Sequence, residues 1–236
     1  MKTIFHSATS RGHADHGWLN AHHSFSFANW YDPNRVHFGM LRVLNDDIVA
    51  AGEGFGMHPH NDMEIITIIL DGALQHKDNM GNGSIIKPGD VQVMSAGTGV
   101  LHSEFNPLES QATNLFQLWI IPKEKNIAPR YDQRTYGVDE RNNKIQTVAS
   151  GFKGENELYI HQDAAISLAK LQPSSSLEYE IKKSGNGVYI MSVNGNIDVE
   201  GTKLNTRDAI GVWETGKIQM SSMTGSDIMI IEVPMN

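Results

Sequence analysis

The 236-residue chain contains no cysteine. Disulfide bonds, thiolate metal sites and cysteine nucleophiles are therefore excluded, and a reducing compartment is the natural setting. The opening stretch, MKTIFHSATSRGHADHGW, has no long apolar run after its single lysine, unlike a signal peptide. No window approaches the apolar length of a membrane span. We therefore expect a cytoplasmic protein without a membrane partner.

Positive charge is also in short supply. Lysine and arginine number 19 against 27 acidic residues, which gives a formal net charge of -8. Binding to nucleic acid phosphates or to an anionic membrane requires a positive surface. The charge balance therefore predicts no direct contact with nucleic acid, although it leaves room for a protein partner. A hydrophobic content of 39% is typical of a folded globular protein.

Helical periodicity is scarce along the chain. Most of the 22 glycines stand between short apolar runs, as in LDGALQHKDNMGNGSIIKPGDVQVMSAGTG. Short apolar runs separated by Asp-Gly, Gly-Asn and Pro-Gly-Asp signals predict many strands joined by turns, in a sandwich or a barrel. The best helical candidate is HQDAAISLAKLQ, residues 161–172, which is equally consistent with a strand and a turn.

A weak internal repeat predicts two copies of one β fold. The stretch ILDGALQ resembles SVNGNIDV, and each is followed by a turn and an acidic residue. We place the join in the polar stretch 132–148. This predicts an amino-terminal domain of residues 1–135 that carries the site and a carboxy-terminal domain of residues 136–236 that does not. The matched positions are Gly72 with Gly195, Asp90 with Asp208, and Gly97 with Gly216.

The candidate chemistry lies in the first half, which holds ten of the eleven histidines. His58 and His60 are two residues apart, so both project from the same face of a strand, and His102 and Glu104 have the same spacing. Together they supply imidazoles and a carboxylate, a set that suits a divalent transition metal, with the carboxylate favouring iron or manganese. Glu64 shares the parity of the first pair, so the spacing allows either glutamate as a ligand.

Other residues have two readings. His76 either faces the same cavity or orients a ligand, or it is a polar residue near a strand end. His22 and His23 have opposite parity, so at most one of them faces a given cavity. The aromatic side chains of FSFANWYDP are expected to pack in the core. Arg130 either pairs with a carboxylate or gates the cavity.

Two stretches resemble the cupin motifs. The segment GFGMHPHNDMEIITIILDG is similar to the first, although Gly72 falls one residue late. The segment GDVQVMSAGTGVLHSEFN is similar to the second, although Ser95 replaces a proline and His102 falls two residues late. With HGWLNAHHSFSFANWYDPN, they resemble the pirin family across essentially the whole chain, and in particular its bacterial quercetinases. The first motif is carried by Gly52, His58, His60 and Glu64.

The resemblance implies a bicupin, an all-β chain of two jelly-roll barrels. It also implies one divalent transition metal per chain, with Fe(II) favoured and Mn, Ni, Co, Cu or Zn as alternatives, held by His58, His60, His102 and Glu104. Glu64 would then either support a ligand from behind or line the wall of the cavity. The implied activity is that of a quercetin 2,3-dioxygenase: a flavonol is opened by O2 with release of carbon monoxide, and Glu104 accepts a proton. The alternatives are a non-catalytic, redox-sensitive regulator that acts through protein partners, and a cupin that acts on another small molecule.

Overall fold

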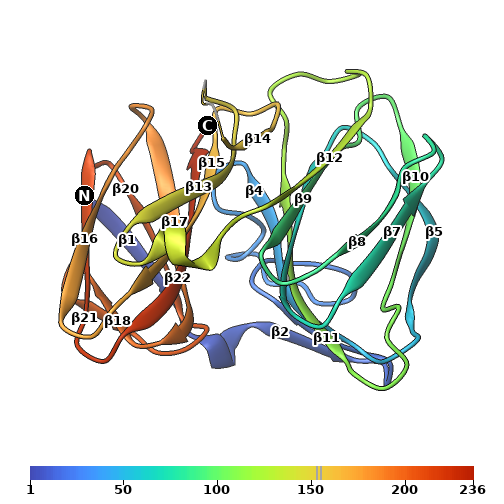
Figure 1. Ribbon diagram of the computed structural model, residues 1–236. Helices are drawn as coiled ribbons and strands as arrows, with labels where there is room; N and C mark the ends of the chain where they lie inside the picture. The colour runs from blue at the N-terminus through green and yellow to red at the C-terminus, as the bar shows by residue number, and fades with distance from the viewer. Residues whose placement is uncertain (153, 155) are drawn as a thin grey trace.

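The computed structural model describes every residue except 153 and 155, and it consists almost entirely of strands. Figure 1 shows two β-barrels side by side, one formed mainly by the first half of the chain and the other mainly by the second half. The all-β bicupin prediction is confirmed. Within the described residues, the helical elements are two short 3₁₀ turns, η1 (Ala8–Ser10) and η2 (Val138–Arg141), and neither has the length or apolar character needed to cross a membrane.

The first barrel is made of two antiparallel sheets. Its large sheet has the order β12-β9-β6-β11-β4-β3-β2, and its small sheet has the order β5-β10-β7-β8. Leu74 and Ile86 of the small sheet pack with Leu115 of the large sheet, which closes the barrel. The strands are β2 (Gly12–Asp15), β3 (Leu19–His23), β4 (Leu41–Val49), β5 (Gly54–His60), β6 (Glu64–Asp71), β7 (Leu74–Asp78), β8 (Gly83–Ile86), β9 (Asp90–Ser95), β10 (Val100–Phe105), β11 (Thr113–Ile120) and β12 (Arg130–Thr135).

The second barrel repeats this plan with the orders β1-β20-β17-β22-β15-β13-β14 and β16-β21-β18-β19. Its edge strand β1 is the amino terminus of the chain, drawn in blue beside β20 in Figure 1. The helical candidate at 161–172 contains a strand, β15. The strands are β1 (Lys2–His6), β13 (Ile145–Ser150), β14 (Leu158–Tyr159), β15 (Ala165–Leu171), β16 (Ser175–Glu180), β17 (Asn186–Gly195), β18 (Ile197–Val199), β19 (Thr202–Leu204), β20 (Ala209–Trp213), β21 (Lys217–Ser222) and β22 (Ser226–Pro234).

The internal repeat has a structural basis. Gly72 and Gly195 occupy the same hairpin in the two barrels, with φ of +81° and +80°, a region that favours glycine. Asp90 and Asp208 each accept a hydrogen bond at 2.9 Å from the backbone N–H three residues earlier. Gly97 and Gly216 also lie in corresponding connections, β9 to β10 and β20 to β21, although only Gly97 has a positive φ. The boundary at residues 135 and 136 stays a prediction.

The largest hydrophobic core lies between the two large sheets. Phe116 and Leu118 of β11 pack there with Tyr189 and Met229 of the second barrel. Because side chains alternate along a strand, the intervening residues of β11, such as Gln117, face the interior of the first barrel instead. One sheet thus joins the two barrels on one face and lines the candidate site on the other.

Candidate metal centre

Three of the predicted ligands meet inside the first barrel. β5 supplies His58 and His60, and its neighbour β10 supplies His102, which lies directly opposite His58 in the register. One ligand nitrogen from each histidine lies within 4.8 Å of the other two. The ring centroids of His102 are 4.4 Å from His58 and 4.9 Å from His60. The alternation argument therefore brings these three imidazoles together.

Glu104 lies two residues beyond His102 on β10. Its carboxylate belongs to a second, overlapping group with His76 and His102, whose ligand atoms also lie within 4.8 Å of one another. Burial raises the pKa of Glu104 to about 7, against the effect of hydrogen bonds from Gln117 at 3.2 Å and Thr67 at 3.4 Å. A neutral carboxyl and its carboxylate are therefore both accessible near neutral pH.

The parity that linked Glu64 to the histidines does not hold. β5 ends at His60 and β6 begins at Glu64, and between them Asp62 turns the chain with φ of +45°. The Glu64 carboxylate accepts a hydrogen bond from Ser95 at 2.8 Å and lies 3.5 Å from His161 Nδ1. Glu64 is absent from both ligand groups and from the residues that line the cavity at the histidines. It therefore does not form part of that wall, and its role in supporting a ligand stays a prediction.

The donor set fits a divalent transition metal. His58 Nδ1 lies 2.7 Å from the Gly56 carbonyl, which can only accept, so the lone pair of this ring is on Nε2. His102 Nε2 is buried without a hydrogen-bond partner among the described residues. Burial and neighbouring imidazoles lower the pKa of His60 to about 4 and of His102 to about 2. Neutral rings with free lone pairs are what metal binding requires.

The three histidines open into a cavity of about 190 Å³ between the two sheets of the first barrel. Most of its other walls are apolar or aromatic, and buried Asp47 lines it too. Burial raises the pKa of Asp47 to about 8, and the negative charges of the nearby Asp46 and Glu104 add to this effect. The other lining residues are Leu19, Ala21, His23, Phe27, Asn45, Phe55, Glu104, Leu115, Gln117 and Trp119.

Sequence reasoning did not assign His23 to this cavity. Its parity matches Leu19 and Ala21 of β3, which also line the wall, and it pairs with Asn45 at 3.0 Å. His22 points elsewhere and stacks on His13 at 4.6 Å, as opposite parity requires. The alternation of β3 would have identified His23 once the inner face of that strand was known.

The remaining open residues now have positions. His76 is fully buried and stacks on Tyr131, with ring centroids 4.6 Å apart. Arg130 donates to Asp132 at 3.1 Å and to the carbonyl of Tyr159, and does not line the cavity at the histidines.

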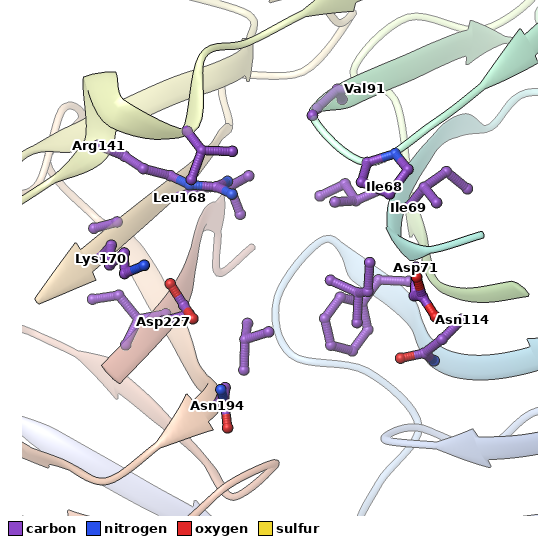
Figure 2. A pocket seen from close by; sticks show the side chains of 18 of the residues that line it. Ile68, Ile69, Asp71, Val91, Asn114, Arg141, Leu168, Lys170, Asn194 and Asp227 are labelled. Carbon is purple, nitrogen blue, oxygen red and sulfur yellow. The ribbon is translucent and has the colours of Figure 1, made fainter. Parts of the chain in front are cut away.

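A larger cavity of about 570 Å³ lies between the two barrels. Figure 2 shows Ile68, Asp71 and Asn114 on one side and Arg141 and Asp227 on the other. Its charged groups have both signs, and histidine does not occur among its lining residues in the described part of the chain. It therefore offers neither a metal donor set nor a preference for a ligand of one charge, and the candidate chemistry belongs to the smaller cavity.

Known proteins share this architecture. The family model described as Pirin matches residues 5–120, and the one described as Quercetinase C-terminal cupin domain matches residues 147–233. A putative quercetin 2,3-dioxygenase of Pseudomonas aeruginosa is 44% identical, over 94% of this chain and 95% of its own. A quercetin 2,3-dioxygenase of Escherichia coli is 42% identical, over 96% of each chain.

A solved structure extends the likeness to the metal. The bacterial pirin YhhW of Escherichia coli, crystallised in complex with nickel(II), is 39% identical over 99% of both chains, with a TM-score of 0.93. The overlapping histidine and glutamate groups described above could likewise hold an ion. Sequence identity over nearly the full length, both family models and the shared two-barrel fold lead to one conclusion: this chain belongs to the pirin family.

Proposed function

We propose that the protein is a metal-dependent dioxygenase that cleaves a flavonol such as quercetin with O2 and releases carbon monoxide. The observation that carries the proposal is the group of three imidazoles that line a largely apolar cavity. Relatives that are 42% and 44% identical bear the name quercetin 2,3-dioxygenase, in one case as putative, and this supports the substrate class.

The proposed ligands are His58, His60, His102 and Glu104, with one metal ion per chain. Fe(II) is favoured by the mixed imidazole and carboxylate donors, while the nickel(II) in a related structure supports nickel as an alternative. When bound, the metal supplies a Lewis acid that lowers the pKa of the flavonol 3-hydroxyl. Glu104, whose carboxylate lines the cavity beside the histidines, is the proposed acceptor of that proton.

The cavity walls would orient the substrate. Phe27 and Trp119 contact each other edge to face, with centroids 5.4 Å apart, and Phe55 lies beside His58. Aromatic walls of this kind can hold a flat ring and exclude water from the reacting atoms. Gln117 holds Glu104 by a hydrogen bond at 3.2 Å and so keeps the proposed base in place.

The cavity volume favours a second candidate function. About 190 Å³ is below the range of roughly 300–1,000 Å³ that is usual for small-molecule pockets, so a three-ring flavonol would lie partly in the half-exposed mouth at His58. A pirin that uses its metal as a redox-sensitive element and acts through a protein partner needs no larger cavity. We rank this regulator second.

Oxygen uptake with quercetin tests the first proposal. We expect consumption by the metal-loaded protein with release of carbon monoxide, loss of both after chelation, and recovery on adding back one ion from iron, manganese, nickel, cobalt or copper. His58→Ala should be inactive, whereas His13→Ala, which changes an exposed histidine outside the cavity, should be active. No metal-dependent uptake with any of these ions would overturn the dioxygenase and favour the regulator.

A further inference from the structure

Behind the proposed metal site, three buried side chains form a continuous line. β7 pairs with β10, which places Asp78 opposite His102 and His76 opposite Glu104. His76 Nε2 lies 3.1 Å from Asp78 Oδ2, and His76 Nδ1 lies 3.4 Å from His102 Nδ1. The side chains of His76 and Asp78 and the whole of His102 have an exposed fraction of 0%. The geometry therefore connects a carboxylate to the proposed ligand through one imidazole.

The hydrogen bonds assign the protons along this line. Asp78 accepts bonds from the backbone N–H groups of Met80 at 2.9 Å and Asn82 at 3.0 Å, and from the Asn82 amide at 2.9 Å. A carboxylate held by three donors acts as an acceptor, so His76 Nε2 carries the proton that it donates to Asp78. The other nitrogen of a neutral His76, Nδ1, must then be an acceptor. His102 Nδ1 donates to it, and the lone pair of His102 is left on Nε2.

A separate observation agrees with this assignment. His102 Nε2 is the atom that is buried without a hydrogen-bond partner among the described residues. Buried polar atoms are nearly always partnered unless a water or an ion takes that place. The proton assignment starts from Asp78, and the unpartnered atom is found on His102. Both identify Nε2 of His102 as the nitrogen whose lone pair is free to bind a metal.

We infer that His76 and Asp78 are positioning residues, which hold His102 in the Nδ1–H tautomer with Nε2 directed at the metal. The inference rests on the proposed role of His102 as a ligand. Outer partners of this kind fix the tautomer and orientation of a ligating histidine, and their loss typically lowers metal affinity about 10–100-fold. The stack of His76 on Tyr131, 4.6 Å between centroids with 24° between planes, fixes the orientation of the imidazole in the middle of the line.

A competing assignment makes His76 itself a ligand. His76, His102 and Glu104 form a group whose ligand atoms lie within 4.8 Å of one another. In that case Nδ1 of His76 would coordinate the ion instead of accepting a bond from His102. The two assignments differ in the number of protein nitrogens on the metal and in the tautomer of His102, and both quantities can be measured.

The first measurement uses the metal-free protein and needs no variant. Nitrogen-15 NMR of the histidine rings reports which nitrogen of His102 carries hydrogen. We expect the Nδ1–H tautomer for His102 and the Nε2–H tautomer for His76. An Nε2–H tautomer at His102 would overturn the inference, whether or not the protein oxidises quercetin.

The second measurement compares Co(II) affinity and the visible spectrum of bound Co(II) in the full chain. His76→Leu removes the acceptor and should weaken binding about 10–100-fold with the coordination number unchanged. His76→Asn keeps a short side-chain carbonyl in the position of Nδ1 and should restore most of the affinity. His13→Leu is the control, since this exposed ring stacks on His22 outside the cavity.

The outcomes separate the inference from the proposed function. Equal affinity in the wild type and His76→Leu would overturn the positioning role. A Co(II) spectrum that shows one ligand fewer in both His76 variants would overturn it in favour of direct coordination. A wild type that binds Co(II), with the expected order of variant affinities but no oxygen uptake on quercetin, would overturn only the dioxygenase.

Discussion

The two barrels share a strand order and differ in what they place at equivalent buried positions. In the first barrel, His102 of β10 lies opposite His58 of β5; in the second, Ile218 of β21 lies opposite Tyr179 of β16. The cross-strand pair between the next two strands of the small sheets shows the same difference. His76 lies opposite Glu104 in the first barrel, and Val199 lies opposite Met220 in the second. The framework therefore folds around apolar side chains, and the polar residues of the first barrel serve another purpose.

The buried carboxylates sharpen this contrast. Glu232 of the second barrel accepts bonds of 2.8–3.0 Å from the Tyr179 hydroxyl, the Asn186 amide and two backbone N–H groups. Glu104 of the first barrel receives longer bonds, at 3.2 Å from Gln117 and at 3.4 Å from a threonine. A buried carboxylate with short bonds to several donors is structural, whereas one with few and long bonds keeps lone pairs for a metal or a proton.

The largest effect is expected when the first barrel is given a residue of the second. His102→Ile removes a proposed ligand, and metal affinity should fall by more than the ~100-fold that loss of an outer partner causes. The free energy of unfolding of the metal-free protein should change less than the metal affinity, because the unpartnered Nε2 is removed while His76 Nδ1 loses its hydrogen-bond donor. Metal content per chain and urea unfolding measure the two effects. Retained metal binding would show that His102 is not a ligand.

The reverse exchange should damage the second barrel. Ile218→His buries a polar ring in a cluster of apolar side chains where the exposed fraction of Ile218 is 0%. We expect a loss of roughly 2–4 kcal/mol in the free energy of unfolding, from the unsatisfied nitrogen and the lost apolar contacts. The control Met220→Leu conserves volume and should cost less than about 1.5 kcal/mol. Equal stability of Ile218→His and the wild type would contradict the view that this interior requires apolar side chains.

Metal binding should stabilise one barrel more than the other. At a free metal concentration of 100 times Kd, a ligand that binds only the folded state adds about 2.7 kcal/mol. Hydrogen exchange should slow most in β5, β7 and β10, where the proposed ligands and His76 lie, and least in β16 and β21. His58→Ala should show no slowing. Uniform slowing in both barrels would indicate that the shared core between the large sheets transmits the effect.

Particular residues show how far the sequence alone predicts this molecule. Alternation along single strands was enough to pair His58 with His60 and His102 with Glu104, because each pair lies within one strand. That the two pairs meet depends on the register between β5 and β10. The same rule failed for Glu64, because a turn at Asp62 separates it from β5. The short-range signals of glycine turns and apolar runs likewise predicted the β fold.

The contacts of His76 could not be predicted, for a different reason. They depend on the cross-strand register of β7 and β10, and no short-range pattern fixes which residues of two strands lie opposite each other. The membership of His23 in the cavity depends in the same way on which face of β3 turns inward. What the sequence specifies locally was predictable, and what depends on pairing between strands required the structure.

The smallest expected effect concerns Glu64, whose position in the second barrel is taken by a glycine. Glu64 lies opposite Ile120, and at the equivalent place Gly187 lies opposite Val233. Burial raises the pKa of Glu64, against hydrogen bonds from Ser95 and the contribution of His161. Since the folded pKa exceeds the unfolded value, the folded state binds this proton more tightly. Proton binding by Glu64 therefore contributes to the free energy of unfolding at low pH. This contribution is lost as the pH rises from the unfolded pKa of Glu64 through its folded pKa.

Glu64→Gln should therefore flatten the pH dependence of unfolding and raise the free energy of unfolding at pH values above the folded pKa of Glu64. Urea unfolding of the metal-free protein at several pH values measures this. Glu178→Gln is the control, because the exposed Glu178 pairs with Lys217 and its pKa is lowered by that contact. A Glu64→Gln curve parallel to the wild type would contradict this prediction. It would mean that Ser95 and His161 compensate the burial of this carboxylate, so that its ionisation does not change the free energy of unfolding.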